Sequence, residues 1–366
     1  VMADDYWRPD DEVNNCQLCN EAFSLFTRKH HCRACGDIFC DDCSSKRMPV
    51  PERQLEMEER VCDTCYAKKK LGTITKIADL PRWGNSAKGS ADGAAAGDRG
   101  YPVNHELNQK IILWLGDFYK LDAEALAFES TPDFGDDSQI MATLHELCGP
   151  ALATECKFLE EARVGEVRLT KGYQLPAKFL IHSLGPFYKP QYKTASESGL
   201  HQCYLRTLEC VKENNLSTVA IHPLYSRDKS YPRHEAPLIA LRTIRRFLDK
   251  FGSGIDAVVL VVDHKADEEM YRDNLPLYFP RNAEEADRSR RTIGETNVSS
   301  MGDAVVPERS ITIGLNPTDD VYRKDPQDDS NPFQRLDDGP APQPAAAAAP
   351  VAASPASDEW QQRLLR

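Results

Sequence analysis

The sequence predicts two folded modules of different kinds, a small metal-built domain and a larger α/β domain, followed by a disordered tail. The first is indicated by four Cys-x-x-Cys pairs between residues 16 and 65. The second is indicated by apolar strand-like runs that alternate with helix-like segments between residues 107 and 280. The third is indicated by an acidic, Pro- and Ala-rich composition after residue 284. A chain of 366 residues has room for two domains, since one domain typically holds about 100–200 residues.

The overall composition limits the classes of function. The formal net charge of −12 argues against broad electrostatic binding to nucleic acid, because a phosphate backbone attracts basic domains. No run approaches the ~20 apolar residues of a membrane span, and the amino end lacks a signal-peptide pattern. We therefore expect a cytoplasmic protein whose membrane contacts are peripheral. Four cysteines outside the paired pattern are expected to be buried small hydrophobes, namely Cys148, Cys156, Cys203 and Cys210.

The eight paired cysteines supply enough thiolates for two tetrahedral zinc sites. This region has too little apolar material for a core of its own, and metal normally replaces the core in so small a module. The pairs could bind sequentially, or they could interleave, with pairs one and three on one ion and pairs two and four on the other. Spacing alone leaves both schemes open. The pairs are Cys16/Cys19, Cys32/Cys35, Cys40/Cys43 and Cys62/Cys65.

A dense basic run lies directly on one metal ligand: Arg28-Lys29-His30-His31-Cys32-Arg33. One explanation is charge compensation, since a tetrathiolate zinc carries a formal charge of −2. The run holds more cations than that requires. Arginine forks and imidazolium donors match the acceptor oxygens of a phosphate by charge-assisted hydrogen bonds. The run therefore predicts a local anion receptor.

Together with Trp7-x-x-Asp10 and Arg60-Val61-Cys62, this run and the eight cysteines resemble a complete FYVE zinc finger over residues 1–70. The resemblance implies two Zn²⁺ ions with interleaved ligands, Cys16, Cys19, Cys40 and Cys43 on one and Cys32, Cys35, Cys62 and Cys65 on the other. It also implies a pocket for the headgroup of phosphatidylinositol 3-phosphate, formed by Asp10, Arg28, Lys29, His30, His31, Arg33 and Arg60.

Two apolar residues, Leu25 and Phe26, lie on a short loop ahead of the basic run. They could be core residues, but a module this small has little core. The FYVE resemblance places both at a loop tip that enters the bilayer, which implies a peripheral protein of the early endosome membrane. Histidine adds a pH expectation: His30 and His31, with an unperturbed pKa near 6.5, should bind a phosphate more tightly at pH 6 than at pH 7.5.

The next segment, residues 71–105, follows Lys68-Lys69-Lys70, is rich in Gly, Ala, Ser and Asp, and is predicted to be a flexible linker. Beyond it, the continuous apolar runs predict an α/β fold with a mixed, largely buried central sheet and a ligand site at the carboxyl edge of its strands. The expected strands are 110–115, 179–182, 218–221 and 257–262, and the expected helices are 141–148, 201–214 and 237–251.

Residues 106–283 resemble a macro domain. The resemblance rests on Gly116-Asp117, Thr170-Lys171-Gly172-Tyr173, Ile181-His182-Ser183-Leu184-Gly185-Pro186 and an arginine-rich segment at 240–248. That segment and Leu277-Tyr278-Phe279-Pro280-Arg281 are most similar to the ganglioside-induced differentiation-associated protein branch.

Macro domains commonly bind ADP-ribose, and the resemblance assigns Asp117 to a nucleotide's adenine. The other determinants differ: residues 124–129 contain no Asn, residues 133–137 contain one glycine among carboxylates, and residues 225–231 contain no glycine. Phosphate cradles need amides at positions that glycine adopts cheaply. We therefore expect a non-catalytic scaffold, with His182 a structural core residue.

These features favour a phosphatidylinositol 3-phosphate-binding endosomal adaptor, with a membrane-targeted ADP-ribose reader or hydrolase as the alternative. A third possibility, a ubiquitin ligase finger, is disfavoured because the expected ligand histidine at Cys-x-His spacing is absent. In the disordered tail, Asn331-Pro332-Phe333 resembles the ligand of endocytic EH domains. A homodimer is also plausible, because doubled contacts strengthen weak membrane binding.

Overall fold

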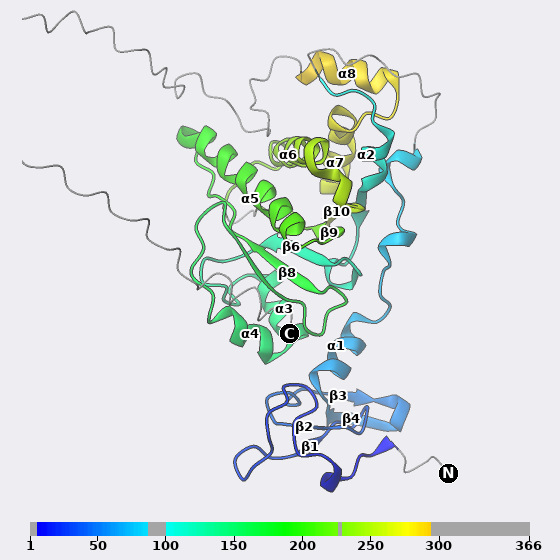
Figure 1. Cartoon of the computed structure of the whole chain (residues 1–366), viewed down its shortest axis with the longest axis vertical. Helices are drawn as coiled ribbons and strands as arrows, with labels where there is room; N and C mark the ends of the chain where they lie inside the picture. The colour runs from blue at the N-terminus through cyan, green and yellow to red at the C-terminus, as the bar shows by residue number, and fades with distance from the viewer. Residues whose placement is uncertain (1–5, 87–99, 226–228, 294–366) are drawn as a thin grey trace, which may run out of the picture. The chain divides into compact units, whose positions relative to one another are not determined.

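The computed structural model describes residues 6–86, 100–225 and 229–293 of the chain (Figure 1). The tail predicted to be disordered lies beyond these ranges from residue 294 on, and so does the EH-type tripeptide at 331–333. Within the described residues, no helix has both the length and the apolar character needed to span a bilayer.

The amino-terminal module is built from short elements around its cysteines. Strands β1 and β2 pair antiparallel, with His30 opposite Phe39 and His31 opposite Ile38. Its buried apolar cluster consists mainly of cysteines, with Phe39, Val50 and Val61 among them, as expected for a domain without a conventional core. The elements are η2 (Asp10–Glu12), β1 (His30–His31), β2 (Ile38–Phe39), β3 (Arg47–Val50), η3 (Pro51–Arg53), β4 (Leu55–Arg60) and α1 (Asp63–Leu71).

The segment after α1 differs from the flexible linker that the sequence predicts. Residues 72–86 contain η4 (Ile77–Asp79) and η5 (Trp83–Ser86), and Ile77 and Trp83 are buried in the cores of the α/β module. The Ile77 amide donates to Asp122 Oδ1 at 2.7 Å, and Trp83 Nε1 donates to the carbonyl of Phe279 at 2.8 Å. Ile77 and Trp83 are isolated apolar residues with no periodic pattern around them, so the sequence gives no signal that this segment is anchored.

The α/β module contains a six-stranded sheet in the order β5-β10-β9-β6-β8-β7, in which β7 alone is antiparallel to its neighbour. The elements are α2 (His105–Lys110), β5 (Ile111–Leu115), η6 (Phe118–Lys120), β6 (Ala125–Glu129), α3 (Gln139–Cys148), α4 (Pro150–Cys156), β7 (Val167–Lys171), β8 (Phe179–Ser183), η7 (Pro190–Tyr192), α5 (Lys193–Glu213), β9 (Thr218–Ile221), α6 (Ala236–Phe251), η8 (Gly252–Gly254), β10 (Ala257–Val262), α7 (Lys265–Tyr278) and α8 (Ala283–Ile293).

Helices cover both faces of this sheet (Figure 1). Residues of α5, α6 and α7 pack on one face, and residues of α3 and α4 pack on the other. The inner strand β10, which lies between β5 and β9, has all six side chains buried, and this explains its continuous apolar sequence. The predicted α/β fold with a mixed central sheet is confirmed.

Most predicted elements are confirmed, and two strands, 218–221 and 257–262, match to the residue. The helix predicted at 201–214 begins earlier, at Lys193, because its first two turns are polar and carry no apolar period. Lys110 ends a short helix rather than beginning the strand. The four cysteines outside the paired pattern are all buried, as predicted.

Residues 284–293, which the sequence assigns to the disordered tail, are folded instead. Residues 283–293 form α8, in which Ala286 and Ser289 are the buried residues. Ser289 Oγ donates to the carbonyl of Leu277 at 2.6 Å and accepts from the amide of Tyr101 at 3.0 Å. Only two residues of this helix are buried, so its polar sequence gives no sign that the helix packs against the α/β module.

Candidate metal centres and headgroup pocket

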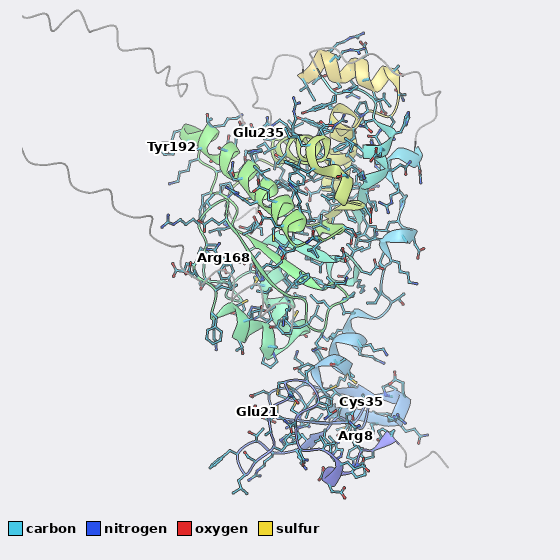
Figure 2. All side chains as sticks on the ribbon, viewed as in Figure 1. Arg8, Glu21, Cys35, Arg168, Tyr192 and Glu235 are labelled. Atoms are coloured by element: carbon cyan, nitrogen blue, oxygen red, sulfur yellow. The ribbon has the colours of Figure 1, made fainter. Side chains whose placement is uncertain are left out.

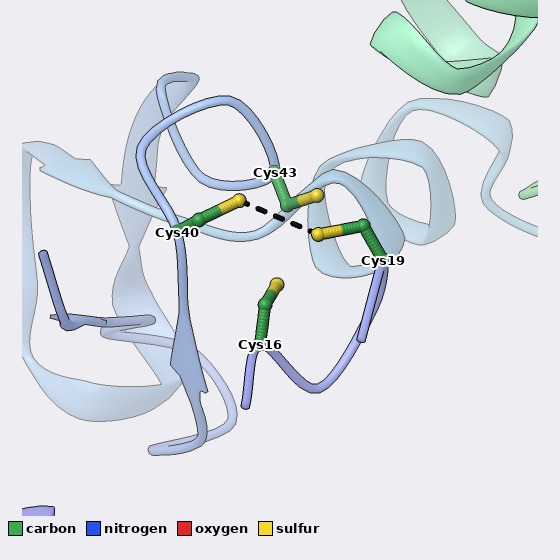
Figure 3. Close-up of side chains that lie close together, drawn as sticks. All are labelled: Cys16, Cys19, Cys40 and Cys43. Atoms are coloured by element: carbon green, nitrogen blue, oxygen red, sulfur yellow. Dashed lines mark hydrogen bonds between the residues drawn. The ribbon is translucent and has the colours of Figure 1, made fainter. Parts of the chain in front are cut away.

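The eight paired cysteines form two clusters, and in each the sulfur atoms lie within 4.8 Å of one another. The clusters are interleaved, which excludes the sequential scheme that spacing had left open. In Figure 3 the side chains of the first cluster converge, with Cys19 Sγ 3.7 Å from Cys40 Sγ. The sets are Cys16, Cys19, Cys40 and Cys43, and Cys32, Cys35, Cys62 and Cys65.

Tight backbone turns position these thiols. The amide of Asn20 donates to the carbonyl of Cys16 at 3.0 Å, and the amide of Gly36 donates to that of Cys32 at 2.8 Å. Gly36 has a φ of +82°, and a Cβ there would lie 1.8 Å from the carbonyl oxygen of Tyr6. Glycine is therefore needed at this turn. Cys62 caps α1, and its sulfur accepts from the amide of Cys65 at 3.5 Å.

The donor sets fit zinc. Four sulfur atoms within 4.8 Å of one another cannot all carry a thiolate charge unless a cation offsets it. Tetrathiolate sets are typical structural zinc ligands. The two clusters could hold two zinc ions.

The basic run is held by contacts with the segment before the first cysteine. His31 stacks on the indole of Trp7, with ring centroids 4.2 Å apart and planes 9° apart, and its Nε2 lies 2.7 Å from the carbonyl oxygen of Arg8. Lys29 Nζ donates to the backbone carbonyl of Asp10. The Asp10 carboxylate itself lies 3.8 Å from His31 Nε2. These contacts hold the Trp7-x-x-Asp10 segment against the basic run.

Arg33 and Arg60, two of the arginines assigned to the headgroup pocket, lie close to the histidines of strand β1. Arg33 donates to the carbonyl of His31 at 2.7 Å, and its guanidinium carbon lies 5.4 Å from the centre of the Trp7 ring. Arg60, at the end of β4, donates to Asp41 Oδ1 at 2.6 Å, and His30 Nε2 lies 3.8 Å from the same carboxylate. Arg28 is exposed, and its charge acts on His30.

Asp41 is a residue of this site that the sequence does not indicate. Its carboxylate lies next to both His30 and Arg60, and the hydrogen bond from Arg60 lowers its pKa. Burial and the charge of Arg60 in turn lower the pKa of His30. No sequence signal marks Asp41, since an acidic residue between two ligand cysteines is unremarkable.

The loop carrying Leu25 and Phe26 exposes both side chains, by 91% and 98% respectively. Ser24 Oγ accepts hydrogen bonds from the amides of Phe26 at 3.2 Å and Thr27 at 3.1 Å, which closes the turn. Figure 2 shows this module with the labelled Arg8, Glu21 and Cys35. Two large apolar side chains that are exposed at a loop tip can bury their surface against a binding partner.

A cavity of about 540 Å³ lies at the carboxyl ends of β5, β9 and β10, the edge where the sequence predicts a ligand site. Asp117 lines it, but its carboxylate accepts from the amide of Tyr119 at 3.1 Å and pairs with Lys120 at 3.0 Å. His222 and Asp263 also line it and lie 2.7 Å apart. Asp117, the residue that the resemblance assigns to adenine, therefore already has two partners within this chain.

Charged side chains lie in both segments that take the place of the phosphate loops, of which the structure describes 133–137, 225 and 229–231. The amide of Gly135 donates to the carboxylate of Asp133 at 3.3 Å, so this turn adds negative charge. Glu129, at the end of β6, pairs with Lys229, whose Nζ also donates to the carbonyl of Gly185 at 3.0 Å.

His182 is a core residue, as the sequence analysis expects. It is fully buried, and its Nε2 lies 2.9 Å from Thr170 Oγ1. Burial lowers its pKa to about 3, so the imidazole is neutral at physiological pH.

Comparison with known proteins agrees with this two-module reading. The family model for the FYVE zinc finger matches residues 6–70, and that for the Macro domain matches residues 133–240. The Protein GDAP2 homolog of Nematostella vectensis is 35% identical over 257 residues, which are 68% of this chain and 51% of that protein. Ganglioside-induced differentiation-associated protein 2 of Bos taurus is 36% identical over 259 residues, 68% of this chain and 52% of that protein.

Among solved structures, the crystal structure of the GDAP2 macro domain is similar with a TM-score of 0.53 and 36% sequence identity. The similarity covers 58% of this chain and 99% of that one. This chain spans about half the length of the curated relatives it matches.

Proposed function

Because this chain belongs to the macro domain family, with a GDAP2-like macro domain joined to a FYVE zinc finger, we propose that it is a phosphatidylinositol 3-phosphate-binding adaptor of endosomal membranes. One arrangement carries the proposal. His30 and His31 form strand β1, Arg33 donates to the carbonyl of His31, and Arg60 shares the Asp41 carboxylate with His30. Leu25 and Phe26 lie exposed on the same small module. Phosphate recognition and bilayer insertion are the two terms that such a module can combine.

Neither term holds the protein on a membrane alone. Burying a large apolar side chain gives about 1.5–3 kcal/mol, and each basic residue near an anionic surface adds about 1 kcal/mol. The phosphate must also compete with Asp41 for Arg60 and His30. Specific binding therefore requires the headgroup, and retention requires the loop tip.

Liposome flotation tests this function. Vesicles containing phosphatidylinositol 3-phosphate should recover the protein, whereas those with phosphatidylinositol or phosphatidylinositol 4-phosphate should not. Arg33→Ala should abolish the preference, and Phe26→Ser should weaken recovery on every vesicle. Matched controls are Arg272→Ala and Phe158→Ser, two exposed residues of the macro domain. Equal recovery on all three lipids would reject the proposal.

For the macro domain we propose a non-catalytic scaffold role. The self-satisfied Asp117, the Asp133 turn and the Glu129–Lys229 pair support it. The alternative, a membrane-targeted ADP-ribose reader or hydrolase, draws on the cavity of about 540 Å³. Calorimetry with ADP-ribose separates the two, since micromolar affinity would favour the reader.

Three further expectations belong to the same proposal. We place the zinc finger at residues 1–70 and, given the anchored segment and α8, extend the macro domain to about 72–293. Homodimerisation would double the membrane contacts. An EH-domain partner would bind Asn331-Pro332-Phe333, which lies outside the described residues.

A further inference from the structure

Three arginines of α6, Arg242, Arg245 and Arg246, gather within two turns of the helix and do not line the cavity of about 540 Å³ described above. Like charges at this spacing repel one another. Such a cluster persists when carboxylates, carbonyls or a bound anion offset it. The three arginine side chains differ sharply in how many partners the protein itself provides to offset their charge.

Arg245 is fully engaged by the fold. Its side chain is 2% exposed, and it donates to the carbonyls of Tyr278 at 2.6 Å and Pro102 at 3.4 Å. Its Nε also pairs with Asp249 at 3.0 Å. This arginine is structural, and it consumes the carboxylate that lies one turn further along the helix.

Arg242 and Arg246 are not engaged in this way. Nε and Nη2 of Arg242 and Nε of Arg246 are shielded from solvent and have no hydrogen-bond partner in the described part of the chain. Both residues are otherwise partly exposed, so a solute can reach the guanidinium groups. A buried donor without a partner costs about 1–3 kcal/mol, and more when it is charged.

Tyr101 adds a donor from another segment of the chain. The residue is 4% exposed, and its hydroxyl is buried with no hydrogen-bond partner among the described residues. Its ring centre lies 5.0 Å from the guanidinium carbons of both Arg245 and Arg246. Burial raises the pKa of Tyr101, so the hydroxyl keeps its proton and can donate.

We propose that Arg242, Arg246 and the Tyr101 hydroxyl form a second anion site, on the macro domain, for a phosphate-type oxyanion. The donors come from two separate segments, and a tetrahedral oxyanion offers several acceptors to meet them. Guanidinium groups suit this ligand class, because their planar fork matches phosphate oxygens and they stay charged. The ligand is inorganic phosphate or the phosphoryl group of a small monoester, which present the same chemistry to the site.

The test uses the full chain carrying Arg33→Ala, which silences the finger pocket so that its phosphate binding does not interfere. Isothermal calorimetry and thermal unfolding at matched ionic strength compare inorganic phosphate, glycerol 3-phosphate and acetate. Saturable binding of either phosphate, with a rise in melting temperature, supports the site, and the preferred one identifies the source. No saturable binding, or equal binding of acetate, would overturn it.

Variants locate the binding. Arg246→Gln should weaken phosphate binding by about tenfold or more, the loss expected for one charge-assisted hydrogen bond. Arg206→Gln, an exposed arginine of α5, should leave it unchanged. Should Arg246→Gln disturb folding, Arg242→Lys keeps the charge, removes the fork, and should still weaken binding. Undiminished binding in a folded Arg246→Gln or Arg242→Lys protein would assign the anion elsewhere and refute the site.

Discussion

The indole of Trp7 lies flat against the imidazole of His31, with ring centroids 4.2 Å apart. Stacked aromatic pairs contribute about 0.5–1.5 kcal/mol beyond their buried area. We expect Trp7→Ala to release the His31 ring and weaken binding to phosphatidylinositol 3-phosphate vesicles by about three- to tenfold. Surface plasmon resonance measures this. Tyr192→Ala, which removes an exposed aromatic of the macro domain, is the control. Unchanged affinity in Trp7→Ala would show that the stack does not organise the pocket.

The Asp41 carboxylate pairs with Arg60 at 2.6 Å and lies 3.8 Å from His30, so we expect it to compete with a lipid phosphate for both. Replacing it by Asn removes the competing charge while keeping the side chain's shape. Because its carboxylate is largely exposed, the gain should be modest, up to about fivefold tighter binding. Asp42→Asn provides a matched control, since Asp42 is the exposed neighbour in sequence. Weaker binding in Asp41→Asn would mean that the carboxylate orients Arg60 instead of competing for it.

Binding should strengthen as pH falls. In the free finger, burial and Arg60 hold the pKa of His30 below its usual value of 6.5, so the ring is mostly neutral at pH 7.5. A bound phosphate favours the charged ring, so binding takes up a proton and affinity rises as pH drops through 6.5 and below. Flotation at pH 7.5, 6.5 and 5.5 measures this. His30→Ala should flatten the profile, whereas His234→Gln, on the macro domain, should not. Equal wild-type binding at every pH would reject the coupling.

Zinc removal should unfold the finger. A structural zinc supplies roughly 10–16 kcal/mol of apparent free energy at pH 7, and the cluster that replaces the core is mostly cysteine. Elemental analysis should find two zinc ions per chain, and Cys35→Ser should lose the second-cluster ion. Cys210→Ser, a buried cysteine of α5, should retain both. A full zinc content in Cys35→Ser would contradict the assigned ligand sets.

The anchored segment before the macro domain should contribute to its stability. Trp83 is 6% exposed and donates to the carbonyl of Phe279, so Trp83→Ala should cost about 3–5 kcal/mol of unfolding free energy. Urea denaturation followed by circular dichroism gives the value. Arg53→Ala, whose guanidinium lies over Tyr6 in the finger, serves as the control and should leave the macro domain transition in place. A loss of unfolding free energy below about 1 kcal/mol in Trp83→Ala would show that this segment acts only as a linker.

The sequence predicted the features that appear as a pattern of residues along the chain. The cysteine pairs and the basic run identified the finger, and continuous apolar runs such as Ala257–Val262 identified the sheet. Features that depend on a single distant partner were missed. Asp41 meets Arg60 because of how the finger folds, and Trp83 meets Phe279 across 196 residues. Neither contact leaves a periodic trace, since each involves one side chain.

The bond between Trp83 and Phe279 also sets an order for folding during synthesis. The apolar cluster of the finger draws on residues 16–66 alone, so the finger can close around its metal as soon as it leaves the ribosome. The segment around Trp83 must wait until nearly two hundred further residues have been made, because its acceptor follows α7. For that interval the nascent chain carries a completed finger ahead of an unfinished macro domain, so the finger can meet its ligands before the rest of the protein has folded.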